Sequence, residues 1–427
     1  MNYTAIFRDI ISITHHDYAG WEEKQGWDNP EAFLNEINSY ELSQKMTVEI
    51  FKKIVDEYLL DFKEPHMFFT FNESDMIKNK DVGFQVRRFE DALYVTEIGQ
   101  EKRIYKGAKI ISIDGESISS LSEIKSKKLR EVHPERENWN KILLESKSCN
   151  FIDENGMFQT MEIISFNSEK KSSCYTIKAL NDQTLLLTLT DLENPDAISD
   201  LIESYHNELD TCTNLIVDVR KNAGGSTSAF NPILPYIFPK GFKSGEIEVE
   251  EMEFNCTDRN TELIIQEYYD VLQLIEDKET IKMMESFKTQ FEKNRGKGFI
   301  VFDFSEFIEE TKSNLKGRDL PKKIFVLSDV YCGSAGDAFV QMCKSSSKAT
   351  IIGRATMGLN DYSNLVTKTW NDQFSLHYPT SRLKKKTKID AIHGKGVIPD
   401  IYIPWTPAHI KEDIELKKAM GLIHSSV

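Results

Sequence analysis

The chain has 427 residues, of which 40% are hydrophobic and 28% are charged, so it has enough apolar material for a large buried core. This length exceeds one average domain and predicts two or three. The formal net charge of −15 opposes binding to nucleic acid or to an anionic membrane, because both need clustered Lys and Arg side chains.

Cysteine spacing and hydropathy exclude further classes of protein. The six cysteines are scattered without Cys-x-x-Cys spacing, which argues against a zinc knuckle and against a disulfide framework. No stretch approaches the ~20 apolar residues of a membrane span, and the N-terminus lacks a basic segment followed by an apolar one. The sequence therefore predicts a cytoplasmic protein in a reducing compartment.

The first region, residues 1–75, is predicted to be helical as far as residue 62, because apolar residues recur at i, i+4 spacing on one wide face. Pro65 stops the helix, since it lacks an N–H and disfavours helical geometry in the preceding residue. The next run, Met67–Phe71, is aromatic-rich and typical of a strand. His66 therefore lies at a helix-to-strand junction, where rigid neighbours can hold its side chain next to a cleft.

The second region, residues 76–170, changes to short strands separated by turns, among them the strong hairpin signal Asp114-Gly115. This pattern resembles a PDZ domain, with Lys80–Phe84 in the place of the loop that holds a peptide carboxylate in that family. A generic small β-domain packed on a catalytic core is the alternative. The resemblance implies peptide binding by Val82, Gly83 and Phe84.

In the third region, residues 171–427, strands alternate with helices, which predicts an α/β core with ligands at the carboxyl ends of its strands. The stretch 244–318 interrupts this alternation with a Glu- and Lys-rich helical segment. We interpret it as an insertion, either a lid over the site or a helical decoration without a gating role. The predicted strands are 183–189, 214–219, 323–328 and 349–353, and a helix is predicted at 226–237.

Ser334 is the candidate nucleophile, since it follows a predicted strand and a Cys332-Gly333 turn and opens the next predicted helix. Serine needs a base to accept its proton, and a developing oxyanion needs donors such as the N–H groups at a helix start. Small neighbours would let a substrate backbone come close. On local sequence alone, however, a helix N-cap explains Ser334 better.

The segment Asp218–Gly225 follows a predicted buried strand and ends in two adjacent glycines, Gly224 and Gly225. Glycines at a strand end permit positive φ and expose N–H groups to a ligand, which suits an oxyanion donor. A plain βα turn or a phosphate loop is the alternative. A Walker-type loop is disfavoured because no Gly-Lys-Ser/Thr follows.

Three segments resemble the serine peptidases that include the C-terminal processing (tail-specific) proteases, the tricorn protease core and the chlamydial secreted protease. Their order and spacing, with the PDZ-like module upstream, make the resemblance specific over residues 60–405. It implies an α/β fold with a crotonase/Clp-protease-like spiral core, no metal or other cofactor, and a peptide or unfolded protein as substrate. The segments are Asp218–Gly225, Ser334–Asp337 followed by Ile351–Gly358, and Gly394–Asp400.

The family has two catalytic styles. Tail-specific members pair the serine with a lysine 25 residues later, where this chain has Leu359, so the resemblance excludes that style. Tricorn-like members use a histidine just after a helix, which identifies His66 as the general base, and a Glu in the position of His393. A neutral imidazole at 393 can accept an N–H bond from His66 but stabilises the imidazolium less than a carboxylate does. Asp390 taking over the orienting role and an impaired site are the alternatives.

The sequence thus predicts a serine endopeptidase without nucleic-acid or membrane partners, and it does not predict the oligomeric state. A catalytically impaired family member that binds peptides through its PDZ-like module is the first alternative. A crotonase-type acyl-CoA enzyme is the second, disfavoured by the PDZ-like module and by the pairing of a serine with a histidine. The expected roles are attack by Ser334, acid–base catalysis by His66, orientation by His393, and oxyanion binding by the N–H groups of Gly224, Gly225 and Ala335.

Overall fold

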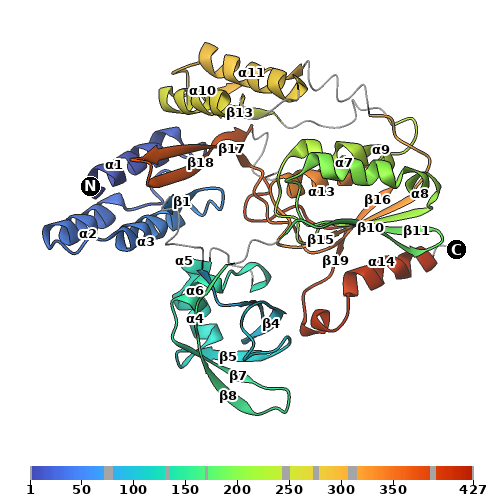
Figure 1. Ribbon diagram of the computed structural model, residues 1–427, viewed down its shortest axis with the longest axis horizontal. Coiled ribbons are helices and arrows are strands. Elements are labelled where there is room, and N and C mark those ends of the chain that lie inside the picture. Colours follow the sequence, from blue (N-terminus) through green and yellow to red (C-terminus); the bar gives the residue numbers. More distant parts are fainter. Residues whose placement is uncertain are drawn as a thin grey trace. The chain divides into compact units, whose positions relative to one another are not determined.

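The computed structural model describes residues 2–71, 80–129, 134–168, 172–242, 251–272, 278–305, 315–384 and 391–425, with the backbone alone at residues 271 and 278–280. The chain divides into two compact units, each assembled from three stretches of sequence (Figure 1). Unit 1 comprises Met1–Ser74, Ser244–Asn314 and Leu359–Ala391, and unit 2 comprises Asp75–Lys243, Leu315–Gly358 and Ile392–Val427.

The N-terminal part of unit 1 is helical. Asn2 caps the first helix by accepting a hydrogen bond from the Ala5 N–H, and Thr47 caps the third through the Ile50 N–H. The predicted helical region is confirmed at residues 3–17, 30–42 and 48–62, whereas residues 18–29 and 43–47 lie outside helices. The elements are α1 (Tyr3–Ser12), a π-helical turn at Ile13–Asp17, α2 (Pro30–Leu42), α3 (Val48–Leu59) and a 3-10 turn at Leu60–Phe62.

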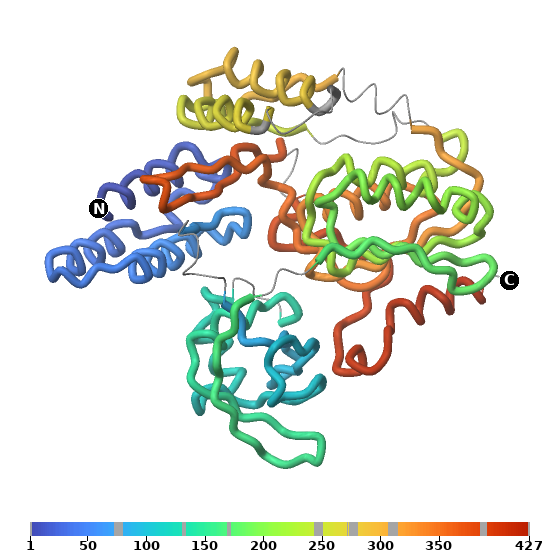
Figure 2. The backbone as a smooth tube through the Cα atoms, viewed as in Figure 1, coloured from blue at the N-terminus to red at the C-terminus, as the bar shows by residue number. Residues whose placement is uncertain are grey.

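An antiparallel sheet joins this N-terminal part to segments far along the chain. Strand β18 is central and pairs with β1, β13 and β17, so Figure 2 shows the blue N-terminal helices beside the red β17–β18 hairpin. The strand predicted at Met67–Phe71 is confirmed as β1. The strands are β1 (Phe68–Phe71), β13 (Met252–Asn255), β14 (Phe299–Val301), β17 (Tyr362–Trp370) and β18 (Phe374–Leu383).

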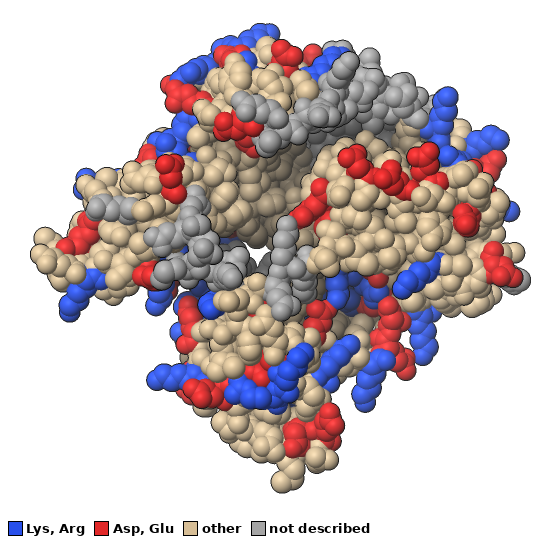
Figure 3. Space-filling model, in the orientation of Figure 1, with Lys and Arg blue, Asp and Glu red and all other residues tan. Residues whose placement is uncertain are grey.

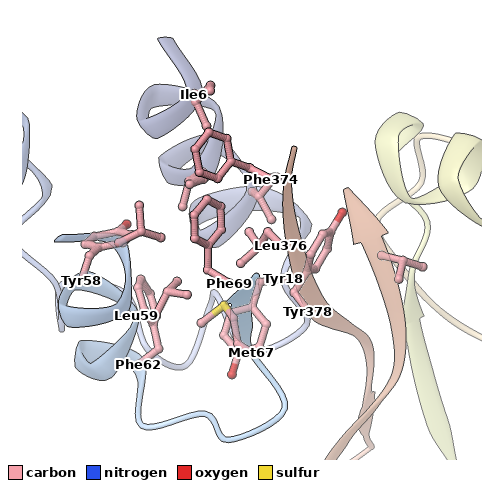
Figure 4. Close-up of a cluster of buried hydrophobic side chains, with 14 of the residues drawn as sticks. Ile6, Tyr18, Tyr58, Leu59, Phe62, Met67, Phe69, Phe374, Leu376 and Tyr378 are labelled. Carbon is pink, nitrogen blue, oxygen red and sulfur yellow. The ribbon is translucent and has the colours of Figure 1, made fainter. Parts of the chain in front are cut away.

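The core of unit 1 is rich in aromatic side chains (Figure 4). Phe69 stacks on Phe374 with ring centroids 5.4 Å apart, and Phe51 meets the same Phe374 ring edge-on at 5.4 Å. Such pairs add stabilisation beyond the apolar area that they bury. Phe62 and Met67 both belong to this core, so the short connection between them is held at each end.

The segment Ser244–Asn314 of unit 1 supplies both helices and strands. It contains α10 (Asp258–Leu272) and α11 (Lys278–Lys293), which confirms the helical character predicted for 244–318. The prediction missed β13 and β14, because strands of three or four residues carry too little alternation to be recognised in a sequence.

The first part of unit 2 is a small antiparallel domain, called here the β-domain (residues 80–168). The hairpin predicted at Asp114-Gly115 is confirmed, with φ values of 50° and 84° in a two-residue loop. Its strands are β2 (Lys80–Asp81), β3 (Phe84–Phe89), β4 (Ala92–Ile98), β5 (Lys109–Ile113), β6 (Glu116–Ser117), β7 (Ser148–Ile152), β8 (Phe158–Glu162) and β9 (Phe166–Asn167). Its helices are α4 (Ile118–Ile124), α5 (Ser126–Leu129) and α6 (Asn140–Leu144), with a 3-10 turn at Pro134–Arg136.

The rest of unit 2 is built on a six-stranded sheet in the order β10-β11-β12-β15-β16-β19. The first pair is antiparallel and the others are parallel. All four strands predicted for this region are confirmed. The strands are β10 (Tyr175–Asn181), β11 (Thr184–Leu189), β12 (Asn214–Asp218), β15 (Lys323–Ser328), β16 (Ala349–Gly353) and β19 (Ile401–Tyr402).

Helices cover both faces of this sheet, with α7, α9 and α13 on one face and α14 on the other (Figure 1). The helix predicted at 226–237 is a 3-10 turn as far as Ile233, because Pro232 has no N–H to donate. The helices are α7 (Pro195–Ser204), α8 (His206–Thr211), α9 (Leu234–Ile237), α13 (Ala335–Lys344) and α14 (Ile414–His424), with 3-10 turns at Thr227–Ile233 and Pro407–Ile410.

Charges of both signs are interspersed over the surface that Figure 3 shows. Within the β-domain, for example, Arg88 pairs with Glu137 and Lys128 with Glu145. No helix in the described part of the chain is long and apolar enough to cross a membrane.

The aromatic core predicts a stability effect for Phe374, whose side chain is fully buried. We expect Phe374→Ala to lower the free energy of unfolding by about 3–5 kcal/mol, because it removes the ring contacts and leaves a cavity. Leu42→Ala is the control, since Leu42 is 86% exposed and its loss should change stability by less than about 0.5 kcal/mol. Urea unfolding measures both. A loss below about 1 kcal/mol for Phe374→Ala would contradict this view of the core.

Candidate active site

Two turns leave the parallel sheet of unit 2 at the same edge. Strand β12 ends at Asp218 and strand β15 at Ser328, and the two strands are adjacent and parallel, with Asp218 opposite Leu327. Because parallel strands end at a common edge, the glycine loop after β12 and the turn that leads to Ser334 emerge together.

Ser334 is the last residue of its turn and immediately precedes α13. Its backbone has φ 56° and ψ −121°, a region that residues with a Cβ rarely adopt and that costs roughly 1–3 kcal/mol. A sharp strand-to-helix turn of this kind presents the serine Oγ at the end of a sheet in many hydrolases. A serine that only caps a helix does not need this strained backbone conformation.

Asp337 holds the turn from the helix side. Its buried carboxylate accepts hydrogen bonds from the Ser334 N–H (2.8 Å) and from the Gly358 N–H (2.9 Å). A carboxylate in the first turn of a helix is also favoured by the helix dipole. Asp337 therefore ties the start of α13 to the loop that ends at Gly358.

Asn222 holds the turn from the side of the glycine loop. Its carbonyl oxygen accepts the Gly333 N–H (2.9 Å), and its side-chain Oδ1 accepts the Gly224 N–H (3.0 Å). Its side-chain Nδ2 donates to the Leu189 carbonyl at the end of β11 (3.2 Å). Asn222 is completely buried, so these bonds are shielded from water. One residue thus connects the glycine loop, the nucleophile turn and the sheet.

The two glycines of the loop differ in their hydrogen bonds. The Gly224 N–H is donated to Asn222 Oδ1, so it would have to leave Asn222 to bind an oxyanion. The oxyanion role expected of Gly224 stays a prediction. The Gly225 N–H takes no part in the bridge to Leu192, whose hydrogen bonds use Gly224 O and the Ser226 N–H. The Ala335 N–H opens α13, where a helix offers no acceptor of its own. Gly225 and Ala335 are therefore the donors that the local geometry favours.

His66 lies in unit 1, in the connection between the 3-10 turn at Leu60–Phe62 and β1. Its main-chain N–H donates to Glu64 Oε1 (3.1 Å), and its Nδ1 lies 2.8 Å from the Tyr362 carbonyl oxygen. Since a carbonyl can only accept, Nδ1 carries the proton, and Nε2 of the neutral ring has the free electron pair. That is the tautomer a general base needs.

His393 lies in unit 2, in a tight turn where the Ile392 carbonyl accepts the N–H groups of Lys395 and Gly396. The Val397 N–H donates to Thr356 Oγ1 (2.8 Å), which attaches this turn to the loop that Asp337 also holds. From the sequence, His393 is expected to accept a hydrogen bond from Nδ1 of His66. In the structure the Tyr362 carbonyl oxygen lies 2.8 Å from Nδ1 of His66, and the orienting role expected of His393 stays a prediction. Asp390, the alternative, lies outside the described residues.

A buried ion network supports the start of the nucleophile turn, and the sequence did not reveal it. Asp329, the residue after β15, pairs with Arg87 of the β-domain (2.9 Å) and with Arg354 (2.8 Å). Burial alone would raise the pKa of the Asp329 carboxyl, but the two guanidinium groups outweigh it and hold the pKa below its ordinary value. Arg354 also pairs with the buried Glu415 (2.6 Å). These residues lack a local pattern, because their partners are far apart in sequence.

The predicted peptide-binding residues have internal roles in the structure. Val82 and Phe84 are buried in the core of the β-domain. The Gly83 N–H donates to Asp81 Oδ1 (2.6 Å), so a carboxylate of the chain itself already occupies the donor expected to bind a peptide terminus. Among the described residues, no group of three His, Cys, Asp or Glu side chains could hold a metal ion.

A strained serine beside a glycine loop, at the carboxyl edge of a parallel sheet, is the arrangement of a serine hydrolase. Residues 183–403, more than half of the chain, match the model of peptidase family S41. The chain therefore belongs to peptidase family S41, a family of serine peptidases. The family predicted from the three motifs is confirmed.

Solved structures of mature CPAF share the fold. Mature CPAF in complex with lactacystin is 11% identical, with 99% of this chain and 98% of that chain covered and a TM-score of 0.63. A second structure of mature CPAF is 12% identical, covering 96% and 94% of the two chains, with a TM-score of 0.61. The photosystem II D1 C-terminal processing protease is 13% identical over 94% and 93%, with a TM-score of 0.43. A search of curated proteins found no match.

Gly224 lies so close to Ser334 that a methyl group on Gly224 is expected to disturb the proposed nucleophile. A Cβ on Gly224 would lie 2.7 Å from Ser334 Cβ and 3.2 Å from Oγ, and φ at Gly224 is +105°. We expect Gly224→Ala to lower the rate of Ser334 labelling by a fluorophosphonate probe by at least about 100-fold, since it displaces the nucleophile by a large fraction of an ångström.

Gly115→Ala is the matched control, because φ at Gly115 is +84° but a Cβ there would meet no atom within 4 Å. It should cost a similar backbone strain, about 1 kcal/mol of stability, and leave the labelling rate unchanged. Equal labelling in the two variants would contradict the described contact between Gly224 and Ser334.

Proposed function

We propose that this protein is a serine endopeptidase that cleaves peptides or unfolded protein C-terminal regions through an acyl-enzyme. The observation that carries the proposal is the strained turn at Ser334, whose Oγ would lie 3.2 Å from a Cβ on Gly224. Backbone strain lowers the stability of the fold, but it can present the side chain of a nucleophile.

In the proposed reaction, Ser334 Oγ attacks the scissile carbonyl carbon while its proton passes to Nε2 of His66. The N–H groups of Gly225 and Ala335 hold the oxygen that gains negative charge. His66 then gives its proton to the leaving amine, and the same imidazole deprotonates the water that hydrolyses the acyl-enzyme. The proton on Nδ1, held by the Tyr362 carbonyl, leaves Nε2 available for this cycle.

We place the enzyme in the Ser–His branch of its family. The position 25 residues after Ser334 is Leu359, a buried residue with no titratable group. His66 is in unit 1 and Ser334 is in unit 2, so the proposal pairs residues of two compact units. Labelling of Ser334 in a His66 variant tests that pairing.

We propose that the β-domain is PDZ-like and that the core is of the crotonase/Clp-protease type, with domains at 1–75, 76–170 and 171–427. The β3-β4-β5-β7-β8 sheet with its short helices supports the first part, and the parallel sheet covered by helices supports the second. Peptide capture through the Gly83 N–H is disfavoured, because Asp81 already accepts its hydrogen bond. A scaffold function would therefore need another part of the β-domain.

We propose that His393 takes part in catalysis, but in another role than the one expected from the sequence. Because the Tyr362 carbonyl already selects the tautomer of His66, His393 is proposed to stabilise the imidazolium that forms during the reaction. The attachment of its turn to Thr356 supports a fixed position for it.

A fluorophosphonate probe tests the proposed nucleophile and base together. We expect one phosphonyl adduct, mapped by mass spectrometry to Ser334, and a labelling rate about 10²–10⁴-fold lower in His66→Ala, because the serine then lacks its base. His206→Ala is the control, since His206 is exposed and its ring bonds, among the described residues, to the nearby Glu203 carbonyl. Labelling at the wild-type rate in His66→Ala would reject the assigned base. Absence of labelling with C-terminal peptides still bound would favour the scaffold.

The variant His393→Glu tests the proposed role of residue 393. A carboxylate stabilises an imidazolium better than a neutral imidazole does, so labelling of Ser334 at pH 6 should be faster than in the wild type by about 3–10-fold. Lys395→Gln is the matched control, because it changes the net charge by the same amount two residues away. Unchanged or slower labelling in His393→Glu, or an equal gain in the control, would count against the role.

A further inference from the structure

A cluster of polar side chains is buried in unit 1 directly beside His66, and the proposed reaction does not use it. Lys24 Nζ donates to the Tyr18 hydroxyl (2.7 Å) and to Glu64 Oε2 (3.2 Å), and the Tyr18 hydroxyl donates to the same Oε2 (3.0 Å). The Lys24 and Glu64 side chains are 2% and 0% exposed. Tyr18 belongs to the aromatic core that Figure 4 shows.

The two residues that accept hydrogen bonds from His66 are both in contact with the Lys24 ammonium. Glu64 accepts the main-chain N–H of His66 through Oε1, while its Oε2 meets Lys24. Tyr362 accepts the imidazole Nδ1–H, and its ring centroid lies 4.7 Å from Lys24 Nζ. The Tyr362 hydroxyl donates to Glu23, which fixes the far end of that ring. One buried ammonium thus contacts the two groups that set the position of the base.

Stability alone does not account for this arrangement. Burying two charges costs much of what their attraction returns, and well-packed apolar replacements of such pairs are often as stable or more stable. What a satisfied buried network does provide is a single geometry. Burial, followed by the Glu64 charge, raises the pKa of Tyr18 well above its ordinary value, so its hydroxyl stays a donor to Glu64 over the whole working range of pH.

We propose that Lys24 and Glu64 are positioning residues for the general base. Lys24 holds the Glu64 carboxylate and the Tyr362 ring, and these fix the main chain and the imidazole of His66 so that Nε2 keeps one direction. The inference rests on the proposed function, in which His66 is the base. The opposing view is that the ion pair only supports the fold of unit 1.

The double variant Lys24→Met, Glu64→Leu removes both charges together and leaves no unpaired ion in the core. We expect the maximal rate of labelling by the fluorophosphonate probe to fall about 10–100-fold, with the probe concentration at half-maximal rate unchanged, because orientation is lost and probe binding is not. Lys24→Met, Glu64→Gln keeps an oxygen for the His66 N–H and should recover about tenfold, the effect of one hydrogen bond.

A second ion pair of unit 1, which is partly buried, provides the control. Arg259 and Asp17 lie 3.1 Å apart, with exposures of 26% and 8%, and neither is bonded to His66, Glu64 or Tyr362 in any described contact. Arg259→Met, Asp17→Asn should therefore leave the labelling rate within about twofold of wild type. Thermal unfolding of both double variants shows whether the fold is retained.

A double-mutant cycle separates positioning from support of the fold. In a His66→Ala background, Lys24→Met, Glu64→Leu should leave the residual labelling rate within about twofold, because positioning residues act only through the base. An equal fall in both backgrounds, or no fall in the wild-type background, would overturn the inference. If His66→Ala itself labelled at the wild-type rate, the proposed base would fail instead, so the two failures are distinguishable.

Discussion

The buried hydrogen bonds of Asn222 are the constraint on which the rest of the site depends. They join the glycine loop, the turn before Ser334 and the end of β11, three segments that separate strands of the sheet deliver to one edge. A Cβ on Gly336 would lie 3.0 Å from the Asn222 carbonyl oxygen, so α13 starts in close contact with this residue. Because Asn222 uses the Gly224 N–H, it also decides that Gly225 is the glycine with a donor to offer. In the proposed reaction, a hydrogen bond that is structural in itself thus favours Gly225 over Gly224 as the oxyanion donor.

Buried charged groups that take no part in the proposed reaction lie next to both the proposed nucleophile and the proposed base. In unit 2, Asp329 is neutralised by Arg87 and Arg354 at the start of the nucleophile turn. In unit 1, the Lys24–Glu64 pair lies next to the base. Each is costly to bury, and each is satisfied by further hydrogen bonds, the condition under which a buried pair defines one geometry. In both units, buried and paired charges therefore lie next to a segment that carries a proposed catalytic side chain, Ser334 in unit 2 and His66 in unit 1.

Much of the fold could be predicted from the sequence, because it depends on local patterns. Buried parallel strands such as Lys323–Ser328 are continuous apolar runs, and Asp114-Gly115 demands a tight hairpin whatever surrounds it. The family was likewise predictable from the order of the motifs. The orienting partner of His66 was not, because it is a main-chain carbonyl, and any residue at position 362 has one. The Lys24–Glu64 pair joins positions 40 residues apart, which no periodicity connects.

The central proposal is that Ser334 is the nucleophile and that the N–H groups of Gly225 and Ala335 form the oxyanion-binding site beside it. A crystal structure of the fluorophosphonate adduct tests it most directly. We expect a covalent bond from Ser334 Oγ to phosphorus, with the phosphonyl oxygen about 2.7–3.1 Å from the main-chain nitrogens of Gly225 and Ala335 and with Asn222 still bonded to Gly224. A phosphonyl oxygen that points to solvent, or one that takes the Gly224 N–H away from Asn222, would contradict it.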